Sequence, residues 1–241
     1  MAGEQGFSGG GVRLDKFIAS VTDLSRSDAK RAIKAGDVRV SGQVVGDPQF
    51  EVEASAAVEL VGHRLRAAAP RYFMLHKPEG YVCAARDRRH RTVLDLLDED
   101  NVEALHVAGR LDIDTTGLVL LTDDGQWSHR VTSPKRDCEK TYWLRSAEPI
   151  SEQAVAQFAR GLFLHSEKER LLPARLELLG PCEARLAITE GRYHQVKRMF
   201  GAIGNAVVAL HREAIGPVAL DPDLAEGAYR PLTADEIAAF G

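Results

Sequence analysis

The sequence predicts an α+β protein in which a small unit of two helices and a hairpin precedes a larger domain with a mostly antiparallel sheet. Helical periodicity with capping residues is confined to a few short segments, and short apolar runs separated by turn residues fill most of the remaining chain. No regular sequence repeat is visible. Such irregular alternation favours a central antiparallel sheet flanked by helices over a doubly wound parallel sheet.

Two short helices and a hairpin are predicted near the N-terminus. The apolar residues of segment 14–21 recur at helical spacing, which places them on one stripe of a helix. Ser25 and Asp28 form a capping signal for a second helix, and Gly36 supplies its end. Segment 38–45 contains two β-prone runs around a Ser-Gly turn, which is typical of a hairpin.

Composition divides the chain into four parts. Residues 1–11 contain five glycines and little apolar surface to bury, so we expect a flexible lead-in. The helix and hairpin unit is assigned to residues 12–62, a linker ending in Ala-Ala-Ala-Pro to 63–70, and the larger domain to 71–241.

The larger domain is expected to combine short strands with interspersed helices. Ser151 begins one predicted helix and Gly161 ends it, and Thr233 with Glu236 forms a capping box for another. Helical core spacing also appears in segment 196–203. Strands are predicted at the apolar runs 72–75, 105–108, 118–121, 142–144, 185–188 and 206–210.

Charge and composition narrow the class of protein. No apolar run reaches 18 residues and no signal-peptide pattern opens the chain, so we expect a cytoplasmic protein that does not span a membrane. Three widely spaced cysteines are typical of reduced thiols. The net charge of −4 hides two basic stretches, 13–39 with seven basic residues against four acidic, and 185–212 with five against one. Charge alone leaves nucleic-acid binding open, because solvated helix faces give the same counts.

Several catalytic motifs are absent from the sequence. It contains no phosphate-binding loop of the G-x-x-x-x-G-K-[ST] type, no dinucleotide-binding G-x-G-x-x-G turn, no H-E-x-x-H helix and no G-x-S-x-G elbow. No two of the eight histidines have metal-ligand spacing with a third ligand nearby. We therefore expect no metal site.

A polar loop between two apolar runs, residues 109–117, is the strongest candidate for a catalytic site. It has a glycine at each end and contains Asp112 and Asp114. Loops of this kind can hold a side chain in a cleft against a rigid sheet. An aspartate in a loop can equally close a turn by binding its own backbone, so spacing alone does not distinguish the two roles.

The N-terminal unit resembles the alpha-L RNA-binding module. The resemblance is carried by Arg-Leu-Asp-Lys-Phe-Ile from position 13, Ser-Arg-Ser-Asp-Ala from 25 and Gly-Asp-Val-Arg-Val-Ser-Gly from 36. In that family the second helix lies against RNA, which implies RNA binding by Arg26, Lys30, Arg31 and Lys34.

The larger domain resembles the rRNA pseudouridine synthases. Segment 109–125 looks like their central motif, with Asp112 at the essential aspartate, and segments 71–82, 138–142 and 190–200 match further motifs in the expected order. The similarity is greatest to the RsuA-type branch, which acts on small-subunit rRNA. One departure is His76, where the family usually has an asparagine before Lys-Pro.

The resemblance implies the reaction and the residues that carry it. Asp112 would be the ionised catalytic carboxylate, Lys197 its basic partner, and Tyr142 the ring that stacks on uracil. Arg110, Arg192 and His194 would contact RNA. The expected function is isomerisation of one uridine in 16S small-subunit rRNA by a monomer without cofactor. The alternatives are a related synthase of 23S large-subunit rRNA and a non-catalytic RNA-binding ribosome-assembly factor.

Overall fold

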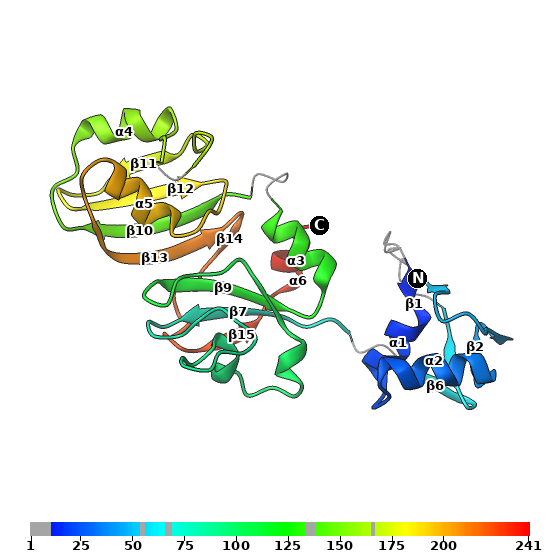
Figure 1. Ribbon diagram of the computed structural model, residues 1–241. Coiled ribbons are helices and arrows are strands. Elements are labelled where there is room, and N and C mark those ends of the chain that lie inside the picture. The colour runs from blue at the N-terminus through cyan, green and yellow to red at the C-terminus, as the bar shows by residue number, and fades with distance from the viewer. Residues whose placement is uncertain (1–10, 54–55, 66–68, 134–137, 165–166) are drawn as a thin grey trace, which may run out of the picture. The chain divides into compact units, whose positions relative to one another are not determined.

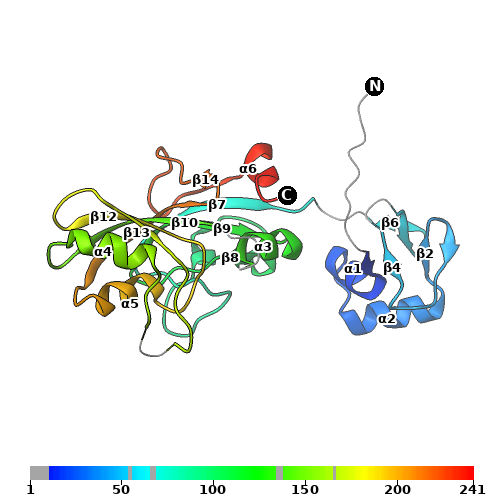
Figure 2. The same cartoon turned by 90° about the horizontal axis from the view of Figure 1, so that it is seen from above.

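The chain forms two compact units in a computed structural model that describes residues 11–53, 56–65, 69–133, 138–164 and 167–241 (Figures 1 and 2). The first unit ends at Ala69 and the second begins at Pro70. Apart from Gly11, the predicted lead-in of residues 1–11 lies outside the described ranges.

The first unit contains the two predicted helices, which pack on a two-stranded and a four-stranded sheet. In helix α2 the Ser25 side chain accepts a hydrogen bond from the Asp28 backbone N–H, and Gly36 ends the helix with φ of 83°. Buried aliphatic side chains of both helices and of the strands share one core, which holds the unit together. The elements are β1 (Val12–Arg13), α1 (Leu14–Val21), α2 (Arg26–Ala35), β2 (Val38–Val40), β3 (Gln43–Val44), β4 (Glu51–Val52), β5 (Val58–Leu60) and β6 (His63–Leu65).

The predicted hairpin is present, but it belongs to a larger sheet with strand order β3-β2-β5-β6. Strand β6 occupies the first three residues of the segment assigned to the linker, 63–70, so that assignment began too early. The turn before β6 has positive φ at both Val61 and Gly62. Such a turn suits a tight hairpin but is rare for valine, and for that reason no clear turn signal is visible at these two residues in the sequence.

The second unit is built on a nine-stranded sheet with main order β11-β12-β10-β13-β9-β7-β15. Neighbouring strands are antiparallel except β13 and β9, which confirms the predicted mostly antiparallel sheet. The strands are β7 (Tyr72–Lys77), β8 (His106–Ala108), β9 (Thr116–Thr122), β10 (Lys140–Ser146), β11 (Arg175–Leu178), β12 (Glu183–Ile188), β13 (Val207–Ile215), β14 (Val218–Ala219) and β15 (Tyr229–Pro231).

Helices cover both faces of this sheet (Figure 2). Helices α4 (Glu152–Ala159) and α5 (Gln195–Ala202) contribute to one core cluster, and α3 (Gly125–Thr132) and α6 (Ala234–Ala238) pack at the other. Strand β9 contributes side chains to both core clusters. Val119 and Leu121 lie in the first, and Leu118 and Leu120 lie in the second, because successive side chains of a strand point to opposite faces. Two covered faces explain why β9 reads as an unbroken apolar run. Two short 3₁₀ helices, Val93–Leu96 and Val102–Ala104, precede β8.

Local signals in the second unit were read correctly. Ser151 caps α4, and Thr233 with Glu236 forms the capping box of α6. Within the described ranges, no helix is long and apolar enough to cross a membrane. All three cysteines are free thiols.

Candidate active site

The loop that carries Asp112 connects β8 to β9. The Thr115 backbone N–H donates to the Asp112 carbonyl at 3.1 Å, which closes a turn and leaves the carboxylate free for other contacts. Both terminal glycines have positive φ, 92° at Gly109 and 107° at Gly117. A Cβ at Gly117 would lie 2.3 Å from the Arg212 carbonyl oxygen, so only glycine lets β9 approach β13 here.

Two buried cations that sequence reasoning missed hold this loop. The Lys77 ammonium donates to the carbonyls of Pro78, Ile113 and Thr115 at 3.0, 3.3 and 2.7 Å. Burial lowers the pKa of Lys77, and nearby acidic groups act in the opposite direction. Arg212, on β13, binds carbonyls at both ends of the loop. The loop is therefore held by side chains of β7 and β13, the two strands that lie on either side of β9.

Asp112 lies against two basic side chains from the start of α5. Its Oδ2 is 3.3 Å from the Lys197 Nζ, and its Oδ1 is 3.4 Å from the His194 Nε2. Lys197 also donates to the Asp114 carboxylate at 2.5 Å. His194 is the residue before the helix and has a φ of 47°, an unusual value for a residue with a side chain. The expected pairing of Asp112 with Lys197 is present in the structure.

The charges at this site favour ionised partners. Burial alone would lower the pKa of Lys197, but contacts with Asp114 and Asp112 outweigh it and raise that pKa. Burial alone would raise the pKa of Asp114, but the hydrogen bond from Lys197 leaves it below its usual value. Lys197 is thus an ammonium at neutral pH.

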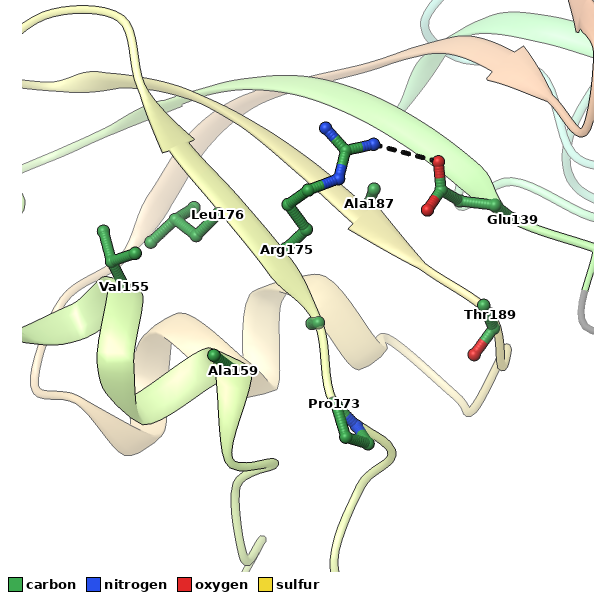
Figure 3. A pocket seen from close by; sticks show the side chains of 9 residues that line it. Glu139, Val155, Ala159, Pro173, Arg175, Leu176, Ala187 and Thr189 are labelled. Atoms are coloured by element: carbon green, nitrogen blue, oxygen red, sulfur yellow. Dashed lines mark hydrogen bonds and ion pairs between the residues drawn. The ribbon is translucent and has the colours of Figure 1, made fainter.

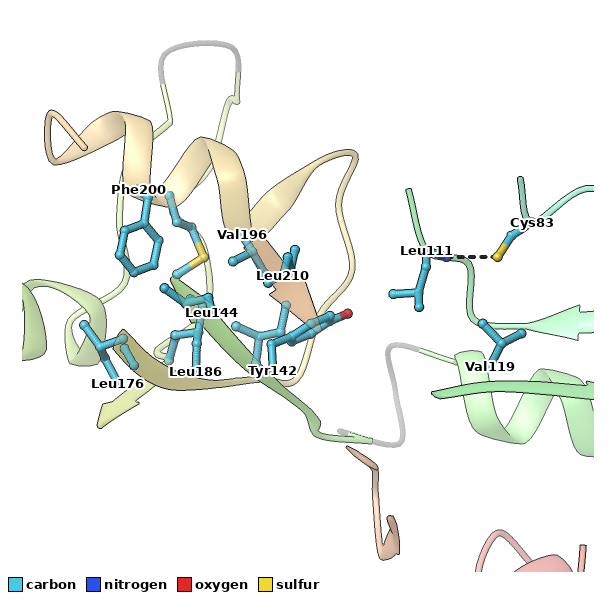
Figure 4. Packing of buried hydrophobic residues seen from close by; sticks show 14 of the residues in the cluster. Cys83, Leu111, Val119, Tyr142, Leu144, Leu176, Leu186, Val196, Phe200 and Leu210 are labelled. Carbon is cyan, nitrogen blue, oxygen red and sulfur yellow. Dashed lines mark hydrogen bonds between the residues drawn. The ribbon is translucent and has the colours of Figure 1, made fainter. Parts of the chain in front are cut away.

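A cavity of about 760 Å³ opens beside these groups and is large enough for a nucleoside. Asp112, Lys197 and Tyr142 all line it. Tyr142 is largely buried among aliphatic side chains, and its hydroxyl lies at the edge of that cluster, on the side of Leu111 (Figure 4). A ring in this position can present a face or its hydroxyl to a planar ligand.

The other predicted RNA-binding residues of this unit have different surroundings. Arg110 is exposed at the cavity, next to Asp112, and its carbonyl accepts from Arg212. The guanidinium of Arg192 donates to Glu190 at 2.9 Å and to Glu167 at 2.8 Å. Arg192 also lines the cavity, but these carboxylates already engage its donors.

Two further cavity residues were missed. The Tyr193 ring is 75% exposed and stacks on the His194 ring, with centroids 3.8 Å apart. The Thr115 hydroxyl is buried and has no hydrogen-bond partner in the described part of the chain. Tyr193 lies inside the motif segment 190–200, so its position could have been noticed in the sequence, but the resemblance implied no role for this residue.

His76, on β7, contacts the loop that follows β14 and a side chain of β13. Its Nδ1 donates to the Leu224 carbonyl at 2.8 Å, and its ring packs edge-on against His211. The departure from the usual asparagine therefore concerns contacts with Leu224, in the loop after β14, and with His211 on β13, and neither residue belongs to the loop that carries Asp112.

In the first unit, the four predicted RNA-binding side chains on α2 are exposed. Arg26 and Lys30 lie 3.3 and 3.8 Å from the buried carboxylate of Asp15, and Arg31 pairs with Asp28. Lys34 has no acidic partner among the described residues. Asp15 orders part of this basic face, and sequence reasoning gave it no such role.

A second, smaller pocket of about 310 Å³ lies between α4 and β11 (Figure 3). Its lining is mostly aliphatic, with one ion pair of 3.1 Å between Arg175 and Glu139. None of the predicted site residues line it. Among the described residues, no group of three His, Cys, Asp or Glu side chains could hold a metal ion.

A carboxylate loop held on a mixed sheet, with a lysine opposite and a nucleoside-sized cavity, is an arrangement suited to chemistry on a nucleoside. The chain belongs to the RNA pseudouridylate synthase family, whose model matches residues 71–202, and an S4 domain model matches residues 12–58. It is therefore an isomerase, a pseudouridine synthase with an N-terminal RNA-binding domain.

Among named relatives, the chain is 54% identical over 231 residues to ribosomal small subunit pseudouridine synthase A of Salmonella typhimurium, which covers 95% of this chain and all of the relative. The protein of that name from Escherichia coli is 55% identical over 228 residues, or 94% of this chain and 99% of the relative. A crystal structure of a pseudouridylate synthase matches with a TM-score of 0.71 and 49% identity, over 95% of this chain and all of that one. The non-catalytic alternative has no support from these similarities.

Proposed function

We propose that the protein isomerises one uridine of 16S small-subunit rRNA to pseudouridine, with Asp112 as the catalytic carboxylate. The observation that carries the proposal is the 3.3 Å contact between Asp112 and Lys197 in a nucleoside-sized cavity. Relatives that align with nearly the whole chain carry the small-subunit name. They favour that target over the alternative of 23S rRNA.

The reaction needs residues that can manage charge without redox chemistry. The bond from ribose C1′ to uracil N1 breaks, the uracil turns, C1′ joins to C5, and the C5 proton leaves while N1 gains one. Asp112 either attacks covalently or stabilises positive charge and moves a proton in a glycal route. Both roles need the carboxylate form, and the Lys197 ammonium lies 3.3 Å from it.

Tyr142 supports the substrate in this proposal. A uridine within folded RNA has to leave its stack before it can occupy the cavity, at a cost of a few kcal/mol. Stacking of uracil on the Tyr142 ring offsets part of that cost. Its hydroxyl would assist the last proton transfer. We assign no cofactor to the reaction.

RNA contacts are proposed for both units. Arg110 and His194 line the cavity, where they would bind backbone phosphate or fill the space left by the extruded base. The role of Arg192 stays a prediction, since RNA would have to compete with Glu167 and Glu190 for its donors. On α2 the contacts are assigned to the exposed Arg26, Lys30, Arg31 and Lys34. We propose that the protein acts on ribosomal RNA as a cytoplasmic monomer.

The test is incubation of the purified full chain with 16S and 23S rRNA transcripts and with assembling small subunits, without added cofactor. New pseudouridine is then located by chemical mapping. The proposal expects one modified position, in 16S rRNA. Modification of 23S rRNA alone would support the alternative target, and no modification of either would contradict the proposal.

A further inference from the structure

The buried guanidinium of Arg212 has no carboxylate partner among the described residues, although its side chain is almost completely inaccessible to solvent. Burying an unpaired cation is costly unless hydrogen bonds compensate it. An apolar residue would fill this core position of β13 at lower cost. We therefore expect the function of this arginine to lie in the groups that its guanidinium binds.

Those donors connect both ends of the loop that carries Asp112. Nη2 donates to the Gly109 carbonyl at 2.8 Å and Nε to the Leu118 carbonyl at 2.8 Å. Nη1 donates to the Arg110 carbonyl at 3.3 Å. One rigid group thus ties the start of the loop to its end, and the carboxylate lies between the two tied points.

The same guanidinium reaches the second predicted catalytic side chain. Nη1 lies 3.5 Å from the Tyr142 hydroxyl oxygen, which accepts a weak hydrogen bond, and the guanidinium carbon is 6.0 Å from the ring centroid. Arg212 also lines the cavity. Arg212 therefore contacts both the Asp112 loop and Tyr142.

We infer that Arg212 is a positioning residue for the isomerisation, which fixes the Asp112 loop and the Tyr142 hydroxyl relative to each other. This inference rests on the proposed catalytic role of Asp112. A lysine cannot replace arginine here, because one ammonium cannot reach carbonyls at both ends of the loop and the hydroxyl in the planar arrangement of a guanidinium. Replacing the guanidinium by an ammonium should therefore lower kcat even though the positive charge remains.

The experiment compares Arg212→Lys and Arg212→Ala in the full chain with wild type, by release of tritium from RNA labelled at uridine C5. We expect kcat to fall about 100-fold in both variants, with KM changed less than about twofold, since misplacement of reacting groups affects the chemical step. Millimolar guanidinium ion should restore part of kcat to Arg212→Ala. Arg185→Ala, which removes a half-exposed arginine paired with Glu213 on the same sheet, is the matched control and should show neither effect.

Wild-type kcat in Arg212→Lys would overturn the inference while leaving the proposed function intact. The inference would also be overturned if Arg212→Ala showed a lower kcat, a raised KM and a lower melting temperature together, with no rescue by guanidinium. Such a result would mean that Arg212 only supports the fold. If Arg212→Ala does not fold, the turnover of Arg212→Lys decides. An inactive wild-type protein would contradict the proposed function itself, which keeps the two failures distinct.

An independent observation concerns the ring of Tyr193, one face of which stacks on His194 while the residue stays 75% exposed. His194 contacts Asp112, so this stacked pair stands at the mouth of the catalytic cavity. Exposed aromatic rings are normal binding sites for unstacked RNA bases. We propose that Tyr193 stacks on a base next to the extruded uridine.

The test uses RNA with 2-aminopurine beside the target uridine, whose fluorescence reports stacking. Tyr193→Phe should bind RNA and quench fluorescence as wild type does, whereas Tyr193→Ala should bind about tenfold more weakly and lose the quenching. Equal affinity and equal quenching in Tyr193→Ala would overturn this assignment.

Discussion

Replacing Lys197 by methionine removes the ammonium opposite the proposed catalytic carboxylate, Asp112, while keeping the length of the side chain. At 3.3 Å from Asp112, the attraction between the two charges is about 1 kcal/mol in a water-like medium and about 5 kcal/mol at an effective dielectric constant of 20. Both side chains are about one quarter exposed, so solvent screens part of this energy. A loss of about 2 kcal/mol corresponds to a fall in kcat of about 30-fold.

The loss should be similar throughout the neutral pH range. Without Lys197, Asp112 keeps His194 as a basic neighbour at 3.4 Å but loses the ammonium at 3.3 Å. The pKa of Lys197 is raised, so in wild type this cation persists throughout the neutral range and supports activity there. The ratio of wild-type kcat to that of Lys197→Met is therefore expected to stay at about 30-fold across the neutral range.

The assay is tritium release from RNA labelled at uridine C5, measured from acidic to alkaline pH at saturating RNA. Lys197→Arg keeps the charge and should retain most of kcat, and Lys168→Met controls for removal of an exposed lysine away from the cavity. A Lys197→Met enzyme with wild-type kcat at every pH would refute the electrostatic reasoning.

Three further predictions concern the fold and RNA binding. Gly117→Ala should lower the free energy of unfolding in urea by about 2 to 4 kcal/mol, because a Cβ there meets the backbone of β13 and φ is positive; an unchanged urea midpoint would contradict the close approach. Replacing Arg26 and Lys30 by glutamine should reduce the slope of log affinity against log salt by about 1.4, and an unchanged slope would exclude phosphate contacts there. Hydrogen bonds from Arg230 lower the pKa of Glu236 to about 2, so this carboxylate stabilises the fold above pH 4.5, its ordinary value, and less as the pH falls towards 2. Glu236→Gln should thus be less stable by about 1 to 3 kcal/mol at pH 7 in urea unfolding, and the difference should narrow in acid; a pH-independent difference would contradict this.

The features that could be read from the sequence are those whose partners lie a few residues apart. Ser25 caps a helix by binding the backbone of Asp28, and both residues are visible in one short window. The unbroken apolar run along β9 likewise needs no distant information. These signals, with the motif segments, were sufficient for the fold class and for the pairing of Asp112 with Lys197.

The features that were missed depend on contacts far apart in the chain. Arg212 occupies the same phase of β13 as Leu210, an inward position, yet the carbonyl of Gly109 that it binds is 103 residues away. Lys77 continues the phase of Phe73 and Leu75 in β7 and is buried with them. A basic residue at a core position of a strand is the signal that could have identified both. The carbonyls that compensate the charge become visible only in the fold.

The most direct measurement compares wild type with Asp112→Asn, which keeps the size of the side chain and removes its charge. The two proteins are incubated with the target rRNA, and pseudouridine formation and RNA affinity are measured on the same samples. We predict no detectable pseudouridine with Asp112→Asn and an affinity within about threefold of wild type, since phosphate contacts elsewhere dominate binding. Pseudouridine formation at the wild-type rate in that variant would contradict the assignment of the catalytic carboxylate.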